Sequence, residues 1–149
     1  MSTSISLAGP DDLERVLGLM ARLHEERRQT FDDAHRRAVT APLLDGSPLG
    51  GVWLIGPQRA PLGYVMVGFS WSMRHGGLVG WLEEIFIRDQ VRGRGIGTEV
   101  LHAVVVNLAR ADLKAMHVLL PADDTALARF CTRTGFTVTS EARLMTDPL

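Results

Sequence analysis

The sequence predicts a single α+β domain, residues 1–149, with a mixed sheet of six to seven strands flanked by about four helices. Two observations indicate this class. Runs rich in branched and aromatic residues follow one another in the middle of the chain, which is typical of an antiparallel meander. Segments with helical periodicity lie before and after that meander. With 149 residues, 46% hydrophobic and 22% charged, the chain fits one soluble domain with one core.

The N-terminal part predicts one strand and two helices. Residues 4–8 can form a short first strand. Pro10 and the aspartates that follow it supply start signals for a helix with an apolar face. A second, more polar helix is predicted from Phe31 to Leu44, ended by Pro42 together with the turn residues 45–48.

The centre and the C-terminal half supply the remaining elements. Three successive strands are predicted over residues 52–55, 63–71 and 79–87, and their short connections make adjacent pairing the expectation. The elements expected after them are a helix from about Gly97, a buried strand over 116–120, a helix capped at 123–124 that runs through Thr134, and closing strands over 136–145.

Composition excludes several classes of function. The formal net charge of -1 gives no overall positive field, so neither nucleic acid nor an anionic membrane is an expected partner. Cys131 is the only cysteine, which excludes an intramolecular disulfide and indicates a reducing, cytoplasmic setting. The histidines show no metal-ligand spacing, and no apolar run is long enough to span a bilayer. We therefore expect no metal and no membrane.

The strongest functional signal is an arginine- and glycine-rich loop between a strand and a helix. Its residues are Arg92, Gly93, Arg94, Gly95, Ile96, Gly97 and Thr98. The first N–H groups of a helix lack intrahelical partners and lie at the positive end of its dipole, so they bind anions. Glycine lets a diphosphate approach the backbone. A glycine-rich turn without a ligand is the alternative interpretation, and two familiar phosphate loops, GxxxxGK[ST] and GxGxxG, do not match.

Two segments match motifs of one known family. Residues 92–97 fit the pyrophosphate motif R/Q-x-x-G-x-G/A, and residues 82–87 precede it where that family has its fourth strand. Residues 124–136 are similar to the helix N-x-x-A-x-x-F-Y-x-x-x-G-F, with Asp124 and Cys131 in place of Asn and Tyr. The chain therefore resembles the GNAT superfamily of acyl-CoA-dependent N-acetyltransferases, and its scaffold residues most resemble the spermidine/spermine acetyltransferase branch.

The resemblance implies a fold and a set of cofactor contacts. The fourth and fifth strands would splay apart, and the pantetheine arm of acetyl-CoA would pair with the fourth like an added strand. The backbone groups of Ile85, Phe86 and Ile87 would make that contact, while the loop 92–98 would hold the pyrophosphate. Asp124 and Phe130 stand at further cofactor positions of the family.

Two adjacent glutamates are the candidates for acid–base chemistry. Relatives carry a general base at this point of the strand, and we assign that role to Glu83, directly or through a water. Alternation along a strand would send Glu84 to the opposite face unless a bulge intervenes, and Glu84 could then bind a cationic substrate. The alternative is that both are solvated carboxylates or partners of Arg88.

Cys131 stands where the family has a tyrosine that is thought to protonate the leaving thiolate. A thiol is much shorter than a phenol, so we expect Cys131 to be a small buried residue and not a proton donor.

The sequence thus predicts an N-acetyltransferase that acts on a primary amine of a small molecule or a peptide. The first two helices and the loop from Trp71 to Gly77 would wall the acceptor pocket. A homodimer could form if the closing strands paired across a twofold axis. The alternative function, motivated by Cys131 and Asp124, is a catalytically inactive acyl-CoA-binding regulatory module.

Overall fold

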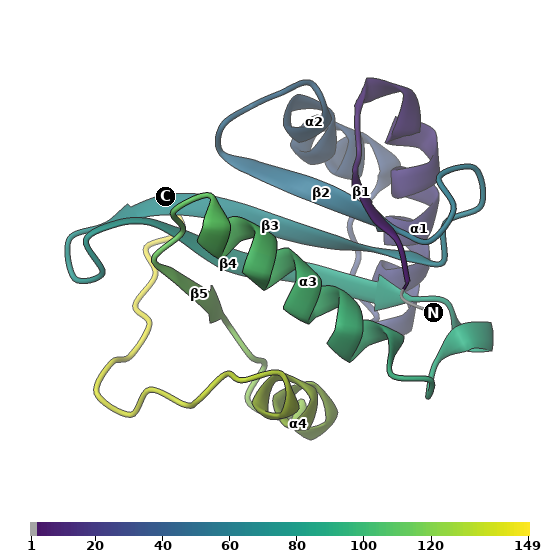
Figure 1. The fold of residues 1–149 in the computed structure, drawn as a ribbon. Coiled ribbons are helices and arrows are strands. Elements are labelled where there is room, and N and C mark those ends of the chain that lie inside the picture. The colour runs from purple at the N-terminus through teal and green to yellow at the C-terminus, as the bar shows by residue number, and fades with distance from the viewer. Residues whose placement is uncertain (1–2) are drawn as a thin grey trace. The chain divides into compact units, whose positions relative to one another are not determined.

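The computed structural model describes residues 3–149. The chain divides into two compact units, which comprise residues 1–119 and 120–149. The first unit contains a five-stranded sheet with three α-helices, and the second contains one α-helix (Figure 1). The four α-helices expected from the sequence are therefore all present in the described residues.

The sheet is mixed, as predicted, and its strands follow one another in chain order. They are β1 (Ile5–Leu7), β2 (Gly50–Ile55), β3 (Gly63–Ser72), β4 (Gly77–Ile87) and β5 (Ala115–Val118). The first four strands pair antiparallel, whereas β5 runs parallel to β4. The parallel pairing requires a crossover, and the helix between β4 and β5 supplies it.

The expected number of six to seven strands is wrong, because residues 136–145 form no strand. This segment alternates apolar and polar residues, which favours a strand only where a neighbouring edge accepts its hydrogen bonds and covers one of its faces. Within the second unit no such edge exists, and Val138 and Met145 are 87% and 93% exposed. The strands expected to mediate a homodimer are consequently not formed.

The helices begin and end close to their predicted positions. They are α1 (Leu13–Glu26), α2 (Asp33–Leu44), α3 (Ile96–Arg110) and α4 (Thr125–Arg133), with two 3-10 turns at Pro10–Asp12 and Asp89–Val91. Asp32 caps α2 by accepting a hydrogen bond from the backbone N–H of His35. Pro42 does not end α2 as expected but lies inside its last turn, and the chain leaves the helix after Leu44.

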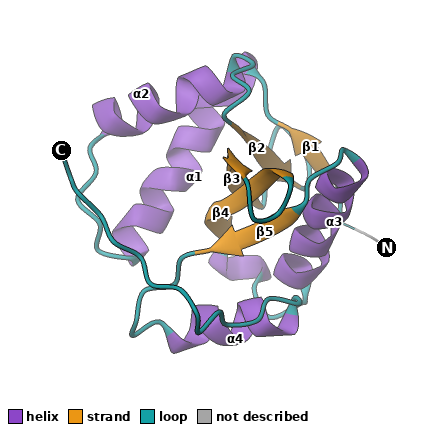
Figure 2. Ribbon diagram, turned by 90° about the vertical axis from the view of Figure 1, so that its left-hand side faces the viewer, coloured by secondary structure: helices purple, strands orange, loops and turns teal. Residues whose placement is uncertain are grey.

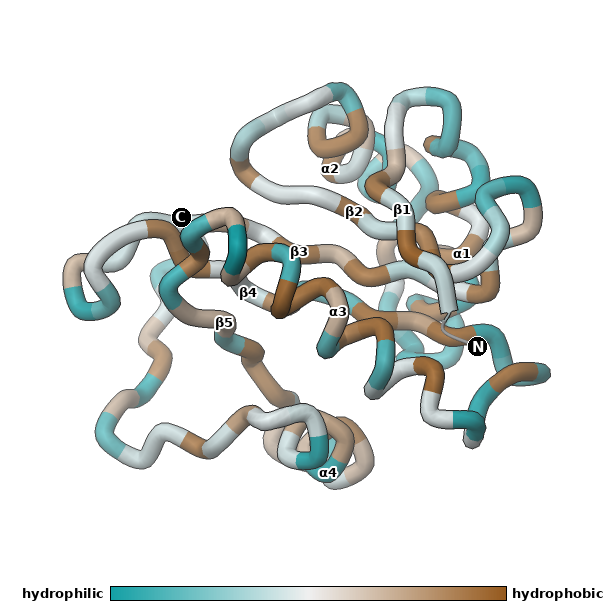
Figure 3. The backbone as a smooth tube through the Cα atoms, in the orientation of Figure 1, coloured by the Kyte–Doolittle hydropathy of each residue, from teal (hydrophilic) through white to brown (hydrophobic). Residues whose placement is uncertain are grey.

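Helices cover both faces of the sheet in the first unit. Two views show α1 and α2 on one face and α3 on the other (Figures 1 and 2). The main core lies under α1 and α2, where Val16, Leu19, Met20 and Leu23 pack with residues of β2, β3 and β4. The strands and α3 are correspondingly rich in hydrophobic residues (Figure 3). This packing fixes α1 and α2 over β4, where the candidate site lies.

Candidate active site

A β-bulge in β4 places both predicted glutamates in one site. Met66 pairs with Glu84, but the next residue, Val67, pairs with Leu82, so Glu83 has no partner on β3. A bulge inserts one extra residue and interrupts the alternation of side chains. Glu83 and Glu84 consequently line the same cavity, which is the exception that the sequence analysis allowed for.

The cavity measures about 250 Å³ and opens between α1, the start of α2 and the strands β3 and β4. Its lining consists of Met20, His24, Arg27, Gln29, Phe31, His35, Arg36, Val39, Thr40, Met66, Glu83 and Glu84. The first two helices thus wall this cavity, whereas the loop from Trp71 to Gly77, also expected to wall an acceptor pocket, contributes no residue. We call it the acceptor cavity.

Glu84 is held rigidly in the wall of the acceptor cavity. Its Oε1 accepts a hydrogen bond from the Tyr64 hydroxyl and its Oε2 lies 2.7 Å from Nε2 of His24, which donates in the tautomer protonated at that atom. Tyr64 is fully buried. Burial, with the charge of Glu84, raises the pKa of Tyr64, so its hydroxyl stays protonated and donates. Both oxygens of Glu84 are therefore already engaged.

Glu83, by contrast, is available for a ligand. Its side chain is exposed and forms no hydrogen bond or ion pair with any residue in the range 3–149. It lies beside Gly68 of β3, where a Cβ would be in ordinary contact with the carboxylate, 3.6 Å from Oε1. Partial desolvation, with the charge of Glu84, raises the pKa of Glu83. A carboxylate with a raised pKa is a better proton acceptor than an ordinary one.

The glycine-rich loop has the geometry of an anion site. Gly93 and Gly95 adopt positive φ angles of 79° and 75°, and Gly95 is the N-cap of α3. The first backbone bond into the helix runs from the N–H of Glu99 to the carbonyl of Gly95. Within the described chain, the N–H groups of residues 93–98 donate to no backbone or side-chain acceptor. The loop therefore presents a run of free donors to any anion placed there.

The two arginines of the loop have different environments. Arg92 pairs with Glu26 of α1 at 2.9 Å and with Asp89 at 2.6 Å, and its Nε donates to the carbonyl of Ile87. Its guanidinium also lies over the ring of Phe86, 5.5 Å from the centroid. Arg92 thus fastens the loop to α1. Arg94 is exposed and makes none of these contacts.

The strands β4 and β5 separate beside the bulge. Their parallel pairing runs from Val79 to Leu82 on β4, and β5 ends at Val118. Residues 83–87 of β4 continue beyond the end of β5 without a strand partner on that side, and the splay of two strands expected from the resemblance stays a prediction. Phe86 is buried in the core, which leaves its backbone, and not its side chain, for an added strand.

In the second unit, the predicted site residues have local structural contacts. Asp124 is the N-cap of α4, and its Oδ1 accepts a hydrogen bond from the backbone N–H of Leu127 at 2.9 Å. The capping role predicted for it is confirmed. Cys131 is 2% exposed, and burial, with the charge of Asp124, raises the pKa of its thiol. The guanidinium of Arg133 lies 6.0 Å from the centre of the Phe130 ring.

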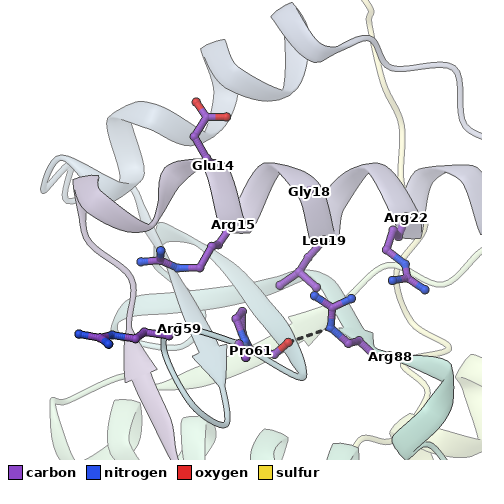
Figure 4. Close-up of a pocket in the computed structure, with 9 residues that line it drawn as sticks. Glu14, Arg15, Gly18, Leu19, Arg22, Arg59, Pro61 and Arg88 are labelled. Carbon is purple, nitrogen blue, oxygen red and sulfur yellow. Dashed lines mark hydrogen bonds between the residues drawn. The ribbon is translucent and has the colours of Figure 1, made fainter.

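A second cavity of about 470 Å³ lies on another side of α1 (Figure 4). Its lining is rich in arginine, and Arg15, Arg22, Arg59 and Arg88 surround Gly18 and Leu19. Arg88 donates from Nε to the carbonyl of Pro61 at 2.9 Å. Within residues 3–149 Arg88 forms no ion pair with Glu83 or Glu84, so that alternative is wrong, whereas the exposed side chain of Glu83 agrees with the other alternative, a solvated carboxylate. This second cavity shares no residue with the acceptor cavity.

Two further features concern the described residues 3–149 as a whole. None of their helices combines the length and the apolar character needed to cross a bilayer. No group of three or more histidine, cysteine, aspartate or glutamate side chains is arranged so that it could hold a metal ion.

Sequence reasoning missed most of the acceptor cavity. The lining residues Arg27 and Arg36 gave no pattern, nor did Tyr64, which lies behind the lining and donates to Glu84, because their positions relative to β4 are set only by the fold. A signal existed for His24 alone: it follows Met20 at helical spacing on the apolar face of α1. A histidine on such a face requires a polar partner, and the structure supplies Glu84.

A bulged strand that leads into a helix with free N–H groups at its start is the arrangement that the resemblance predicts for an acyltransferase scaffold. The chain belongs to the acetyltransferase (GNAT) family, whose model matches residues 16–136. A mycothiol acetyltransferase of Actinosynnema mirum is 28% identical over 71 residues, which are 48% of this chain and 24% of that protein. The chain thus spans about a quarter of that relative's length.

Solved structures share the fold over nearly the whole chain. An integron cassette protein from a salt-marsh metagenome is 27% identical with a TM-score of 0.80, and the alignment covers 97% of this chain and 90% of that one. An aminoglycoside acetyltransferase from an uncultured soil sample has a TM-score of 0.78 at 13% identity, with 99% and 96% covered. At that identity the likeness concerns the fold alone.

Proposed function

We propose that this protein transfers the acetyl group of acetyl-CoA to a primary amine of a small molecule or a peptide. The observation that carries this proposal is the course of β4. Its bulge supplies Glu83 to the acceptor cavity, its unpaired residues 83–87 follow, and the chain then enters the loop with free N–H groups. One strand thus connects a proton acceptor to an anion site.

The residues present fit coenzyme A. The N–H groups of Gly93 to Thr98 would hold the pyrophosphate, and Arg94 would add a charge suited to phosphate oxygens. The backbone of Ile85 and Phe86 would pair with the pantetheine arm. Arg92 would act mainly by fixing the loop, because its guanidinium already pairs with Glu26 and Asp89. The contacts of Asp124 and Phe130 with the cofactor are part of the same proposal.

Glu83 has the properties of the group that deprotonates the amine. An alkylammonium must lose a proton before its nitrogen can attack. Glu83 would accept that proton, directly or through a water, and Glu84 beside it would add negative charge that attracts the ammonium. When bound, acetyl-CoA supplies a thioester whose C–S bond breaks as the new N–C bond forms. Because the Cys131 thiol is buried and its pKa is raised, we assign protonation of the leaving thiolate to water.

The alternative of a regulatory acyl-CoA-binding module has one observation in its favour. Asp124 replaces the family's asparagine, and its carboxylate is engaged as a helix cap. Release of free thiol from acetyl-CoA across a panel of primary amines, with coenzyme A binding measured by calorimetry, separates the two functions. Amine-dependent thiol release supports the transferase. Tight binding without release across the panel would establish the module instead.

A further inference from the structure

We infer that the acceptor is a zwitterion, a small primary amine that also carries a carboxylate or phosphate group. This inference rests on the proposed function and specifies the substrate class of the same cavity. The juxtaposition that carries it is an unpaired anion, Glu83, and an unpaired cation, Arg27, in the lining of one cavity.

The charges of the acceptor cavity are separated between its two walls. Glu83 and Glu84 come from the strand β4, whereas Arg27 follows α1 and Arg36 belongs to α2. A ligand that spans the cavity therefore meets negative charge on the sheet side and positive charge on the helix side. A molecule with one group of each sign complements this arrangement.

The two partly buried charged groups of the cavity, Glu84 and Arg36, already have partners in the protein. Glu84 receives hydrogen bonds from Tyr64 and His24. Arg36 donates from Nη1 to the carbonyl of Phe31 at 2.6 Å, and the same atom lies 3.5 Å from Nδ1 of His24. These contacts hold the guanidinium in place at the cavity. Its Nε, however, is buried and has no acceptor, which is uncommon in a folded protein.

The two exposed charged groups of the cavity, Glu83 and Arg27, have no partner among the described residues. Arg27 and Glu83 are both exposed, and neither side chain forms a hydrogen bond or an ion pair with another residue between 3 and 149. An ammonium beside Glu83 and an anion beside Arg27 would complete both pairs. The planar guanidinium suits carboxylate and phosphate oxygens equally, because it can donate two parallel hydrogen bonds to either.

The lining of the cavity also contains apolar and aromatic side chains. Phe31 stacks on His35 with 4.8 Å between the ring centroids. With His24 it forms a T-shaped pair whose ring centroids are 5.0 Å apart. Phe31 remains 43% exposed, so its ring can cover the carbon body of a ligand. The volume of about 250 Å³ is slightly smaller than that of the usual pocket for a drug-sized ligand. The acceptor is therefore a small amine with a compact carbon body.

The same charges disfavour a polycation. A polyamine or an aminoglycoside brings several ammonium groups, and those that extend beyond Glu83 would approach Arg27 and Arg36. Like charges in a partly desolvated site repel each other. The acceptor cavity thus argues against a polyamine acceptor, and the resemblance to the spermidine/spermine branch, which concerns scaffold residues, is no guide to the substrate.

The test compares matched amines in the thiol-release assay. Phenylalanine, phenylalaninamide and phenethylamine share a carbon body and differ in the anionic group; phosphoethanolamine and spermidine are the phosphate and polycation probes. We expect kcat/KM for phenylalanine or phosphoethanolamine to exceed that for phenylalaninamide, phenethylamine and spermidine by about tenfold or more. The difference should lie mainly in a lower KM. Equal rates across the matched set, or a preference for spermidine, would overturn the inference and leave the acetyltransferase standing.

Variants assign the effect to Arg27. Arg27→Gln should raise KM for the anionic acceptors by about tenfold without raising the phenethylamine KM, so that the preference for the anionic acceptors is lost; Arg27→Lys should restore part of it. Arg22→Gln is the matched control, because Arg22 is an exposed arginine of α1 that lines the other cavity. An effect of Arg22→Gln in place of Arg27→Gln would locate the acceptor in the second cavity and refute the inference. Absence of thiol release with every amine would reject the proposed function as well.

Discussion

Glu83 and Glu84 are neighbours on one β-strand, yet both carboxylates line the same cavity. The bulge opposite Met66 and Val67 removes the alternation that would separate them. The structure then distinguishes the two. Glu84 is fixed by Tyr64 and His24, whereas Glu83 is exposed and has a raised pKa. One carboxylate is a structural anchor and the other is free to accept a proton.

The first prediction concerns the loop that would hold the pyrophosphate. Gly95→Val should weaken coenzyme A binding by more than about tenfold, because a β-branched residue at a φ of 75° costs roughly 1–3 kcal/mol and redirects the free N–H groups. Calorimetry of a folded variant measures this. Gly46→Val is the matched control, since Gly46 also has a positive φ and open space around it but lies after α2. Unchanged affinity in Gly95→Val would remove the loop from the cofactor site.

The second prediction concerns proton transfer. Glu83→Gln should keep coenzyme A affinity but lower kcat by about 10²- to 10⁴-fold, the usual contribution of a general base. Because the pKa of Glu83 is raised, the wild-type kcat/KM should increase with pH through that pKa, as the carboxylate ionises. The Glu83→Gln variant should lack this increase of kcat/KM with pH. An unaltered profile would show that Glu83 is a spectator.

A measurement of the stability of Glu83→Gln shows whether its loss of kcat comes from unfolding of the variant. A carboxyl whose pKa is higher in the folded than in the unfolded protein binds protons more readily when folded, so its contribution to stability is present at low pH and is lost as pH rises through the folded pKa. The ionised Glu83 therefore disfavours the folded state at neutral pH, and Glu83→Gln should be at least as stable there as the wild type.

The third prediction concerns the anchoring role of Glu84. Glu84→Ala leaves the buried hydroxyl of Tyr64 and the ring of His24 without their acceptor. Hydrogen bonds to a charged group contribute about 1.5–3 kcal/mol each, so urea unfolding should show a loss of roughly 2–4 kcal/mol. Glu83→Ala, which breaks no such bond, is the comparison. Equal stability of the two variants would contradict the network.

The fourth prediction concerns Gly18 in the middle of α1. A side chain there would meet no atom within 4 Å, so Gly18→Ala should stabilise the protein by up to about 1 kcal/mol through helix propensity alone. Thermal unfolding measures the change. Gly50→Ala should have the opposite sign, because the new Cβ would lie 2.6 Å from the carbonyl oxygen of Val67. A destabilised Gly18→Ala would mean that the helix surface at the second cavity is not open.

The fifth prediction concerns Cys131. Its buried thiol is shorter than the family's tyrosine and has a raised pKa, so Cys131→Ala should change kcat less than about threefold at equal coenzyme A affinity. Removing a side chain that makes no interaction in the transition state leaves kcat unchanged. Cys131→Tyr should raise kcat if the new hydroxyl protonates the leaving thiolate. A loss of two or more orders of magnitude in well-folded Cys131→Ala would show that the thiol takes part in the chemistry.

The sequence by itself determined the order of helices and strands, the family and the loop at the start of α3. These features are local: a strand and a helix are set by periodicity over a few residues, and the loop by glycines and arginines within seven positions. The same local reasoning failed at residues 136–145, because a strand pattern becomes a strand only beside a partner edge.

Only the tertiary structure decided how the site is composed. The bulge depends on the register between β3 and β4, which no single segment encodes. The acceptor cavity joins Arg27, which follows α1, with Glu84 of β4, and Tyr64 of β3 holds Glu84 from outside the lining. Packing of α1 and α2 against the sheet brings them together, and that packing arises from apolar burial, which carries no information about which polar groups will meet. The arrangement of charged groups around the cavity is therefore apparent only in the folded molecule.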